Sequence, residues 1–346
     1  MKRIVIKIGS SIIYKQHTIN YSLLKKIVYQ INILHTQGWK VFLVSSGAIA
    51  LGMKYLKIYS RPSQMSILQS CASVGQVFLM ELYNKLFKKH NRLCAQVLLT
   101  WEDFVERARY LNAQRTLLKL SEFNILPIIN ENDTVSVEEI KFGDNDRLSS
   151  LVACLVDAKY LIILTDVEGL FFKGKLLNVV EDISDEILKE AKDTTIHTRI
   201  GGMRSKIEAA RIATTCGIKV HICSAFIKDV LLRIVVENEN LGTVFLPKKV
   251  LKAKKRWIAF SAKSKGKIFV DKGAKEALIF RNCSLLSPGI IDVEGEFKKS
   301  DIVEVASSEG EVFAKGMVNF DSSFINKMKG KKIDKEIIHR DYLVLI

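Results

Sequence analysis

Acidic and amide side chains form two compact clusters near the middle of the chain. Residues 130–133 (Asn-Glu-Asn-Asp) directly follow an apolar, strand-like stretch, and residues 143–146 (Gly-Asp-Asn-Asp) come shortly after them. Such donors and acceptors suit a small ligand that carries both an amine and a carboxylate. Two Asx-rich turns that cap helices are the alternative, because Asn and Asp also bond their own backbone. Capping needs one such residue per turn, whereas each cluster has several.

Small residues and a cation stand where other apolar runs end. Lys7 is followed by Gly9 and two serines, which suits a phosphate approached by backbone N–H groups. Residues 45–50 (Ser-Ser-Gly-Ala-Ile-Ala) leave room for a ligand beside the backbone. Thr165 and Asp166 end a further run, and a simple turn is the alternative interpretation of this pair.

Two glycines, Gly201 and Gly202, precede a helical pattern and offer unobstructed amides to an anion. The positive charge of Lys206, in the first turn of that helix, is unfavourable at the positive end of the helix dipole unless a bound anion neutralises it. Together with Arg204, it favours a phosphate site. The segment is not a P-loop, because the G-x-x-x-x-G-K-[ST] spacing is absent.

Six apolar runs in the first 246 residues are predicted strands: 4–8, 41–44, 94–99, 125–129, 160–164 and 219–223. They are continuously apolar, as in parallel strands buried on both faces. Helical periodicity lies between them, as in residues 24–34 before Gly38. The alternation predicts an α/β fold with a doubly wound, mainly parallel sheet. Ligands then bind beyond the carboxyl ends of the strands, where the motifs above lie.

The pattern changes after residue 246. Residues 248–256 contain six Lys and Arg, and we interpret 247–256 as a basic linker, with a nucleic-acid patch as the alternative. Short β-rich pieces follow at 267–270, 277–280, 302–306 and 311–314. The predicted organisation is one domain at 1–246, the linker, and a small, mostly β barrel at 257–346.

Composition places the chain among ordinary globular proteins, with 48% hydrophobic and 26% charged residues. The net charge is +16, and the residues from Pro247 onward hold 21 Lys and Arg against 13 Asp and Glu. Charges break the apolar stretches before they reach the roughly 20 residues of a membrane span or the length of a signal peptide. We therefore expect a cytoplasmic protein without a membrane segment.

The six cysteines show no C-x-x-C spacing and lie mostly among apolar neighbours. This pattern predicts buried free thiols and indicates neither a disulfide framework nor a zinc site.

The motifs together resemble the glutamate 5-kinase family of the amino acid kinase superfamily. The resemblance rests on the order and spacing of residues 7–11, 46–50, 130–133, 143–146, 165–166 and 201–203. The segments 266–274 and 284–290 resemble the PUA domain that many members carry. Nearly the whole chain is covered.

This resemblance implies that the γ-phosphoryl group of ATP is transferred to the side-chain carboxylate of L-glutamate, the first step toward proline. Mg²⁺ would accompany ATP, and the sequence shows no separate metal-ligand motif. Lys7 and Lys206 would neutralise charge in the transition state, with Asp146 orienting both lysines. The remaining roles implied are glutamate binding by Ser46, Asp133 and Asn145, and ATP binding by Lys7, Gly9, Thr165, Asp166, Gly201, Gly202, Met203 and Lys206.

The chain departs from the family's pattern at a few positions. Arg199 and Ile200 lie where further glycine and a threonine are usual, and Arg204 stands where a small hydroxyl residue is common, so we expect an altered nucleotide loop. Asn282 and Ser300 replace residues that are often glycine, so we expect a different turn geometry there.

Two alternatives remain open. One is a kinase for another amino-acid carboxylate, such as aspartate or acetylglutamate; Asp133, as the partner of a free amine, argues against acetylglutamate. The other is an RNA-binding protein, since PUA domains often bind RNA and the tail is basic, although the tail shows no modular series of stacking aromatics. The resemblance also implies a homo-oligomer inhibited by proline.

Overall fold

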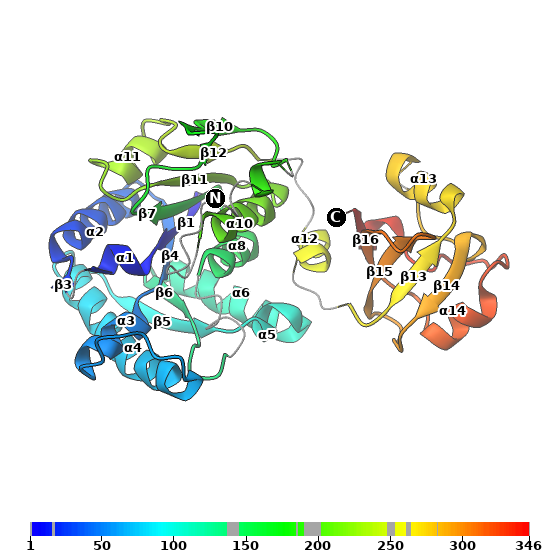
Figure 1. Cartoon of the computed structure of the whole chain (residues 1–346), viewed down its shortest axis with the longest axis horizontal. Helices are drawn as coiled ribbons and strands as arrows, with labels where there is room; N and C mark the ends of the chain where they lie inside the picture. Colours follow the sequence, from blue (N-terminus) through cyan, green and yellow to red (C-terminus); the bar gives the residue numbers. More distant parts are fainter. Residues whose placement is uncertain are drawn as a thin grey trace. The chain divides into compact units, whose positions relative to one another are not determined.

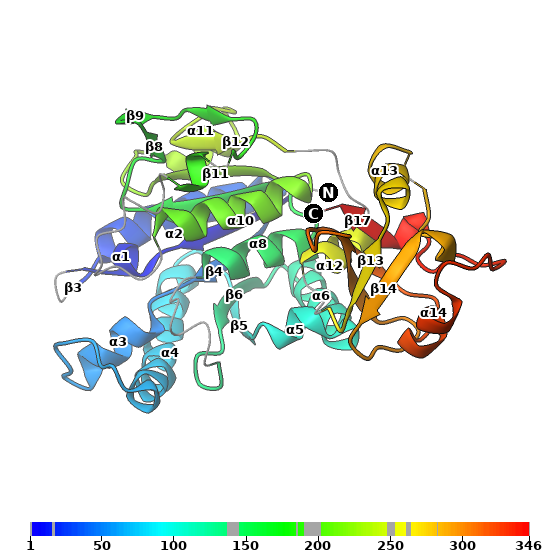
Figure 2. The ribbon, with the colours of Figure 1, turned by 45° about the vertical axis from the view of Figure 1, so that its right-hand side comes forward.

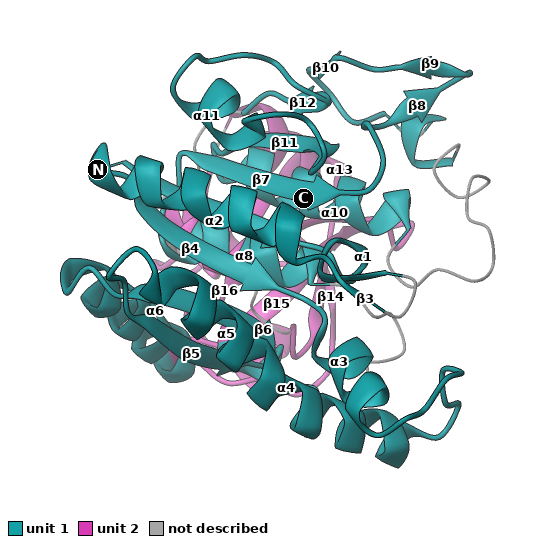
Figure 3. Cartoon of the chain, turned by 90° about the vertical axis from the view of Figure 1, so that its left-hand side faces the viewer, with its two compact units in different colours: residues 1–103, 108–250 teal, residues 104–107, 251–346 magenta. Residues whose placement is uncertain are grey.

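The chain folds into two compact units, residues 1–103 with 108–250 and residues 104–107 with 251–346 (Figure 3). The computed structural model describes residues 2–15, 18–136, 145–184, 186–189, 202–247, 253–260, 264–281 and 283–345. Helix α12 (Ala253–Phe260) occupies part of the predicted linker 247–256, whose residues 248–252 lie outside the described ranges.

An eight-stranded sheet forms the centre of the first unit, with strand order β10-β12-β11-β7-β1-β4-β6-β5 (Figure 1). Six of its strands, from β11 to β5, pair in parallel, which confirms the predicted doubly wound, mainly parallel sheet. In this sheet β12 pairs antiparallel with β11, and β10 pairs parallel with β12, so these two strands run opposite to the other six. The bounds are β1 (Arg3–Ile8), β4 (Lys40–Ser45), β5 (Cys94–Leu99), β6 (Leu126–Glu131), β7 (Tyr160–Thr165), β10 (Val179–Val180), β11 (Lys219–Ser224) and β12 (Thr243–Phe245).

Helices cover both faces of this sheet. Ile4, Ile6 and Ile8 of β1 pack into a core cluster with the apolar side chains of α2 (Tyr21–Thr36) and α11 (Val230–Val235). Because successive side chains of a strand point to opposite faces, Lys7 points to the other face. That face is covered by α8 (Asp146–Leu155) and α10 (Met203–Thr215), which lie side by side (Figure 2). A lysine on this face is therefore aimed at helix termini rather than into the apolar core.

The remaining elements of this part of the chain are short connections and helices. Two small hairpins join β2 (Tyr14–Lys15) to β3 (Thr18–Ile19) and β8 (Phe171–Phe172) to β9 (Lys175–Leu176). The helices are α1 (Ser10–Ile13), α3 (Ala48–Tyr55), α4 (Met65–Lys88), α5 (Glu102–Val105) and α6 (Arg107–Glu122).

Helices α3 and α4 make an unusually close contact. A Cβ atom at Gly75 would lie 1.8 Å from the carbonyl oxygen of Ala48, and one at Gly52 would lie 1.8 Å from that of Cys71. Glycine is therefore required at both positions. By length and composition α4 could span a bilayer, but core helices of soluble proteins meet the same criterion, and α4 contributes Leu79 and Phe87 to the core.

The second unit contains a five-stranded sheet with the order β14-β13-β15-β16-β17. Its strands are β13 (Lys267–Val270), β14 (Ile290–Glu294), β15 (Ile302–Ser307), β16 (Val312–Met317) and β17 (Leu343–Leu345), accompanied by α13 (Lys272–Arg281), α14 (Ser322–Met328) and the 3-10 turns η1 (Ser287–Gly289) and η2 (Arg340–Tyr342). The prediction of a small, mostly β unit is confirmed.

One local prediction in this unit was wrong. Residues 277–280 belong to helix α13 and not to a strand: Asp271 Oδ1 accepts a hydrogen bond from the Ala274 N–H at 2.7 Å and so caps the helix, whose good helix formers then continue it. Ser300 keeps a glycine-like turn, with φ 75°, despite its side chain. The other altered position, Asn282, lies outside the described residues.

Two of the cysteines are joined, contrary to the prediction of free thiols. Cys154 at the end of α8 and Cys216 just after α10 form a disulfide with their Cα atoms 5.9 Å apart. The packing of α8 against α10 brings together two cysteines that are 62 residues apart in sequence. The thiols that remain free are Cys71, Cys94, Cys223 and Cys283.

We predict that reduction of this disulfide destabilises the first unit. Freeing a loop of 62 residues restores conformational entropy to the unfolded chain and lowers the free energy of unfolding by about 4 kcal/mol. Denaturant unfolding with and without a phosphine reductant measures the change. The Cys154→Ser/Cys216→Ser double variant should be insensitive to the reductant, and Cys283→Ser should respond like the parent chain. Equal stability of the parent chain in both conditions would contradict the prediction.

Candidate active site

Two buried lysines share one buried carboxylate beyond the carboxyl end of β1. Lys7 Nζ lies 2.7 Å from Asp146 Oδ1, and Lys206 Nζ lies 3.0 Å from Asp146 Oδ2. The three residues are 2%, 7% and 0% exposed for Lys7, Lys206 and Asp146. Ser205 Oγ also donates to Asp146 Oδ2, at 2.9 Å. One negative charge is thus set against two positive charges, and the group keeps a net positive charge suited to an anion.

Three elements place these groups. Lys7 comes from β1, Asp146 is the first residue of α8, and Lys206 lies in the first turn of α10. A carboxylate at a helix N-terminus is stabilised by the helix dipole, whereas an ammonium there is disfavoured. Asp146 offsets this cost for Lys206. The two helix N-termini therefore converge on the end of β1 and add their partial positive charge to that of the lysines.

Four amide side chains, three of them buried, form a chain of hydrogen bonds next to this group. Asn145 Nδ2 donates to the carbonyl oxygen of Ser45 at 2.9 Å and to Asn130 Oδ1 at 2.6 Å. Asn130 Nδ2 donates to Gln76 Oε1 at 2.9 Å, and Gln76 Nε2 donates to Gln96 Oε1 at 3.1 Å. The chain fixes the amides of Asn130 and Asn145 beside the strand end that precedes Ser46.

Two of the predicted glutamate-binding residues, Asn145 and Ser46, lie at this chain of hydrogen bonds. Asn145 is part of it, and the Ser46 N–H donates to the carbonyl oxygen of Ile8 at 3.0 Å, which holds Ser46 next to the end of β1. Asp133 lies just after β6 and is half-buried. Burial lowers the pKa of Arg61, and the charge of Asp133 opposes that shift, so these two charges are near each other. Binding of an amine by Asp133 stays a prediction.

The predicted nucleotide-binding residues come from the ends of β1 and β7 and the start of α10. The Gly9 N–H donates to the carbonyl oxygen of Leu164 at 3.4 Å, so the loop after β1 lies against the end of β7. Thr165 is the buried last residue of β7, and Asp166 Oδ2 lies 3.8 Å from Lys15 Nζ.

The glycine segment is described only in part. Gly202 is the N-cap of α10 in an extended conformation, and Met203 begins the helix. Arg199, Ile200 and Gly201 of this segment lie outside the described ranges, as do Gly143 and Asp144 of the second acidic-amide cluster. Arg204, expected to alter the loop, is exposed, and its Nε pairs with Glu208 Oε1 at 3.0 Å along the helix surface.

Comparison with known proteins identifies the family. The pattern of the Amino acid kinase family matches residues 2–224, and that of the PUA domain matches residues 266–340. Curated relatives named glutamate 5-kinase include that of Thermoanaerobacter sp. (strain X514), which is 43% identical over 99% of this chain and 98% of its own length. The relative from Carboxydothermus hydrogenoformans is 42% identical over 100% of this chain and 98% of its own length. The relative from Methanosarcina barkeri is 41% identical over 97% of this chain and 91% of its own length. The chain belongs to the glutamate 5-kinase family. This confirms the resemblance predicted from the motifs.

Three residues that contribute to the site of this glutamate 5-kinase family member were not predicted from the sequence. Ser205 contacts Asp146, and Gln76 and Gln96 support the amide chain. Gln76 had a signal, because it is an uncharged polar residue among Ala72, Gly75 and Leu79 on the buried side of α4. The sequence around Gln96 and Ser205 contains no comparable signal.

We predict that Gln76 positions the amides of this glutamate 5-kinase family member. Gln76→Leu leaves the Asn130 amide without its acceptor, so the Asn130 and Asn145 side chains lose their fixed orientation. The KM for the amino-acid substrate should rise about tenfold or more while the KM for ATP changes little. Steady-state kinetics measures both constants.

Asn84→Leu, at an exposed amide on the same helix, is the matched control. Equal changes in both KM values for Gln76→Leu, or none in either, would contradict a positioning role. Circular dichroism establishes that both variants are folded.

Proposed function

We propose that this chain transfers the γ-phosphoryl group of ATP to the side-chain carboxylate of L-glutamate, forming glutamyl 5-phosphate on the route to proline. The observation that carries the proposal is the pair of buried lysines held on Asp146, in a chain whose relatives are named glutamate 5-kinase over nearly their whole length. ATP supplies the phosphoryl group, and glutamate supplies the attacking oxygen.

The acceptor needs no general base. A glutamate side chain has an ordinary pKa of about 4.3, so its carboxylate is ionised and nucleophilic at neutral pH. No proton has to be removed, and a catalytic base is unnecessary. The task of the protein is to hold two anions in line, because a carboxylate and a triphosphate repel each other.

Lys7 and Lys206 are the groups suited to this task. Their ammonium groups are buried with a single carboxylate between them, so charge developing on the transferring phosphoryl oxygens is stabilised in a low-dielectric setting. Asp146 is a positioning residue: it binds both ammonium groups and Ser205, and this fixes the lysines before the substrates arrive. Ser46, Asn145 and Asp133 would orient glutamate, with Asp133 binding its amine.

Mg²⁺ enters the reaction with ATP as the co-substrate MgATP. Asp146 is already bound by two ammonium groups and a hydroxyl, so its carboxylate does not fit a metal ligand. Mg²⁺ in kinases is held by the substrate phosphates, water and one or two carboxylates, and it would neutralise part of the phosphate charge. The chain's own contribution is the lysine pair.

Hydroxylamine trapping with purified chain, MgATP and L-glutamate tests the proposal. The acyl phosphate reacts to give a hydroxamate, which should form with glutamate at a rate far above that with aspartate or acetylglutamate. A signal with another acceptor alone would replace glutamate while keeping the reaction class. No signal with any acceptor, from folded protein, would contradict the proposed activity.

Lys206 should be required for turnover rather than for binding. Lys206→Met removes a charge that stabilises the transition state, so kcat should fall by about 10² or more while the KM for glutamate changes little. Arg211→Met, at an exposed cation on the same helix, is the control and should keep the parent kcat. A Lys206→Met kcat within about threefold of the parent value would contradict the role.

The implied partners and location stay predictions. They are a homo-oligomer, inhibition by proline, RNA binding by the second unit, and residence in the cytoplasm. RNA binding has a simple signature, because an electrostatic complex weakens steeply as salt concentration rises.

A further inference from the structure

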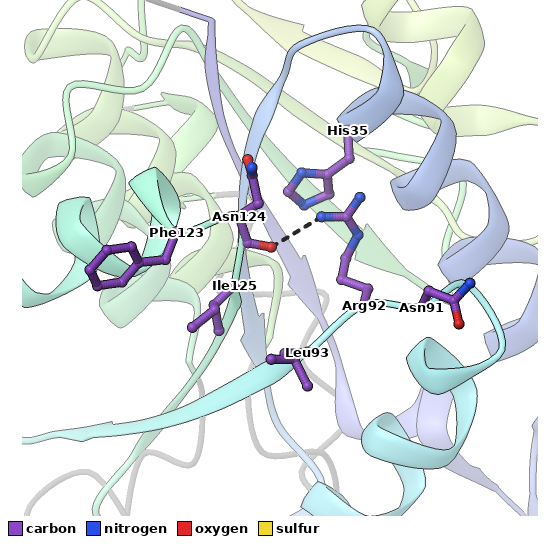
Figure 4. Close-up of a pocket in the computed structure, with 7 residues that line it drawn as sticks. All are labelled: His35, Asn91, Arg92, Leu93, Phe123, Asn124 and Ile125. Atoms are coloured by element: carbon purple, nitrogen blue, oxygen red, sulfur yellow. Dashed lines mark hydrogen bonds between the residues drawn. The ribbon is translucent and has the colours of Figure 1, made fainter.

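A pocket lies at the amino ends of the strands, whereas the candidate active site lies beyond their carboxyl ends. It has a volume of about 400 Å³ and is formed where α2 ends and where the chain enters β5 and β6 (Figure 4). The strand β4 begins here with Lys40, whereas its other end leads to Ser46. A ligand bound in this pocket would therefore not occupy the glutamate or ATP positions.

Positive charge in this pocket has no acidic partner among the residues that line it. Arg92 and His35 line the pocket next to each other, and Lys40 Nζ donates to Asn124 Oδ1 at 2.8 Å. The lining residues include no Asp or Glu. A guanidinium that is partly withdrawn from water is stabilised by an anionic partner, and the pocket lining supplies none.

Two buried nitrogen atoms in the pocket lack a hydrogen-bond partner within the described part of the chain. They are Arg92 Nε and His35 Nε2. Arg92 Nη1 donates to the carbonyl oxygen of Asn124 at 3.2 Å, which holds the guanidinium in place (Figure 4). Buried polar groups without partners are costly. Arg92 Nε can only donate and is available to an acceptor, and His35 Nε2 is available to one in the tautomer that carries its proton there.

The titration of His35 agrees with this picture. Burial, together with the charges of Arg92 and Lys40, lowers the pKa of His35 to about 3. No negative charge opposes this shift. His35 is therefore neutral at physiological pH, and an anion in the pocket would raise its pKa by offsetting the two neighbouring cations.

Two apolar residues are also among those that line the pocket. Leu93 and Phe123 line it and are 72% and 68% exposed. Exposed apolar side chains beside a cationic pocket suit a ligand with an apolar part and an anionic part. A planar guanidinium fork matches the geometry of carboxylate and phosphate oxygens.

We propose that the pocket formed by His35, Arg92, Asn124, Leu93 and Phe123 binds a small organic oxyanion, a phosphate or carboxylate joined to an apolar group. Arg92 binds the oxyanion, His35 contributes a further hydrogen bond, and Phe123 contacts the apolar group. The site is separate from the one that binds glutamate and ATP, so it is tested without reference to catalysis.

Calorimetric titration of the full chain with phenyl phosphate, benzoate and inorganic phosphate, at constant ionic strength, tests the proposal. We expect saturable binding of phenyl phosphate or benzoate, and the difference between them identifies the anionic group. Arg92→Gln should weaken that binding about tenfold or more, since it removes a charge-assisted hydrogen bond. Arg115→Gln, at an exposed arginine of α6, should leave it unchanged.

Phe123→Ala keeps the test decisive if Arg92→Gln fails to fold. Its side chain is largely exposed, so the variant should fold, bind phenyl phosphate more weakly and bind inorganic phosphate as before. The NMR signal of His35, assigned with His35→Gln, should shift on ligand addition and titrate at a higher pH than in the free chain. Absence of saturable binding by all three anions, or equal binding by Arg92→Gln and the parent chain, would overturn the proposal.

Discussion

The carboxylate of Asp146 is the constraint on which the site depends. It binds Lys7 and Lys206 at 2.7 and 3.0 Å while fully buried, and without it two ammonium groups would be buried side by side. Removing one partner of a buried charge group typically costs about 3–5 kcal/mol, because the remaining charges lose their compensation. The same carboxylate therefore stabilises the fold around it and prepares the cations for a transferring phosphoryl group.

The rest of the first unit serves to bring these three residues together. Alternation along β1 turns Lys7 away from the α2 face, and the packing of α8 against α10 places Asp146 beside Lys206. The Cys154–Cys216 disulfide joins the same two helices near their other ends. The amide chain from Gln96 to Asn145 supports the neighbouring side of the site, so that each polar group is held by another fixed group.

Sequence reasoning succeeded where a pattern depends on neighbours in the chain. The largely apolar runs of β1, β5 and β7 were predicted within about a residue, because the strands of a parallel sheet covered by helices are rich in apolar side chains. The four residues 277–280 were misassigned, because a short apolar run fits a helix as well as a strand and the cap at Asp271 decided between them. The disulfide and the role of Gln76 depend on helix packing between distant segments, which no local pattern contains.

A double-mutant cycle on Asp146 and Lys206 tests the central claim most directly. Single-turnover formation of the acyl phosphate would be measured for the parent chain, Asp146→Asn, Lys206→Met and the double variant. If Asp146 acts by holding the lysines, the double variant should lose far less than the product of the two single losses, with a coupling of at least about tenfold. Independent, multiplicative losses would contradict the account, because Asp146 would then act on the reaction by a route that does not include Lys206.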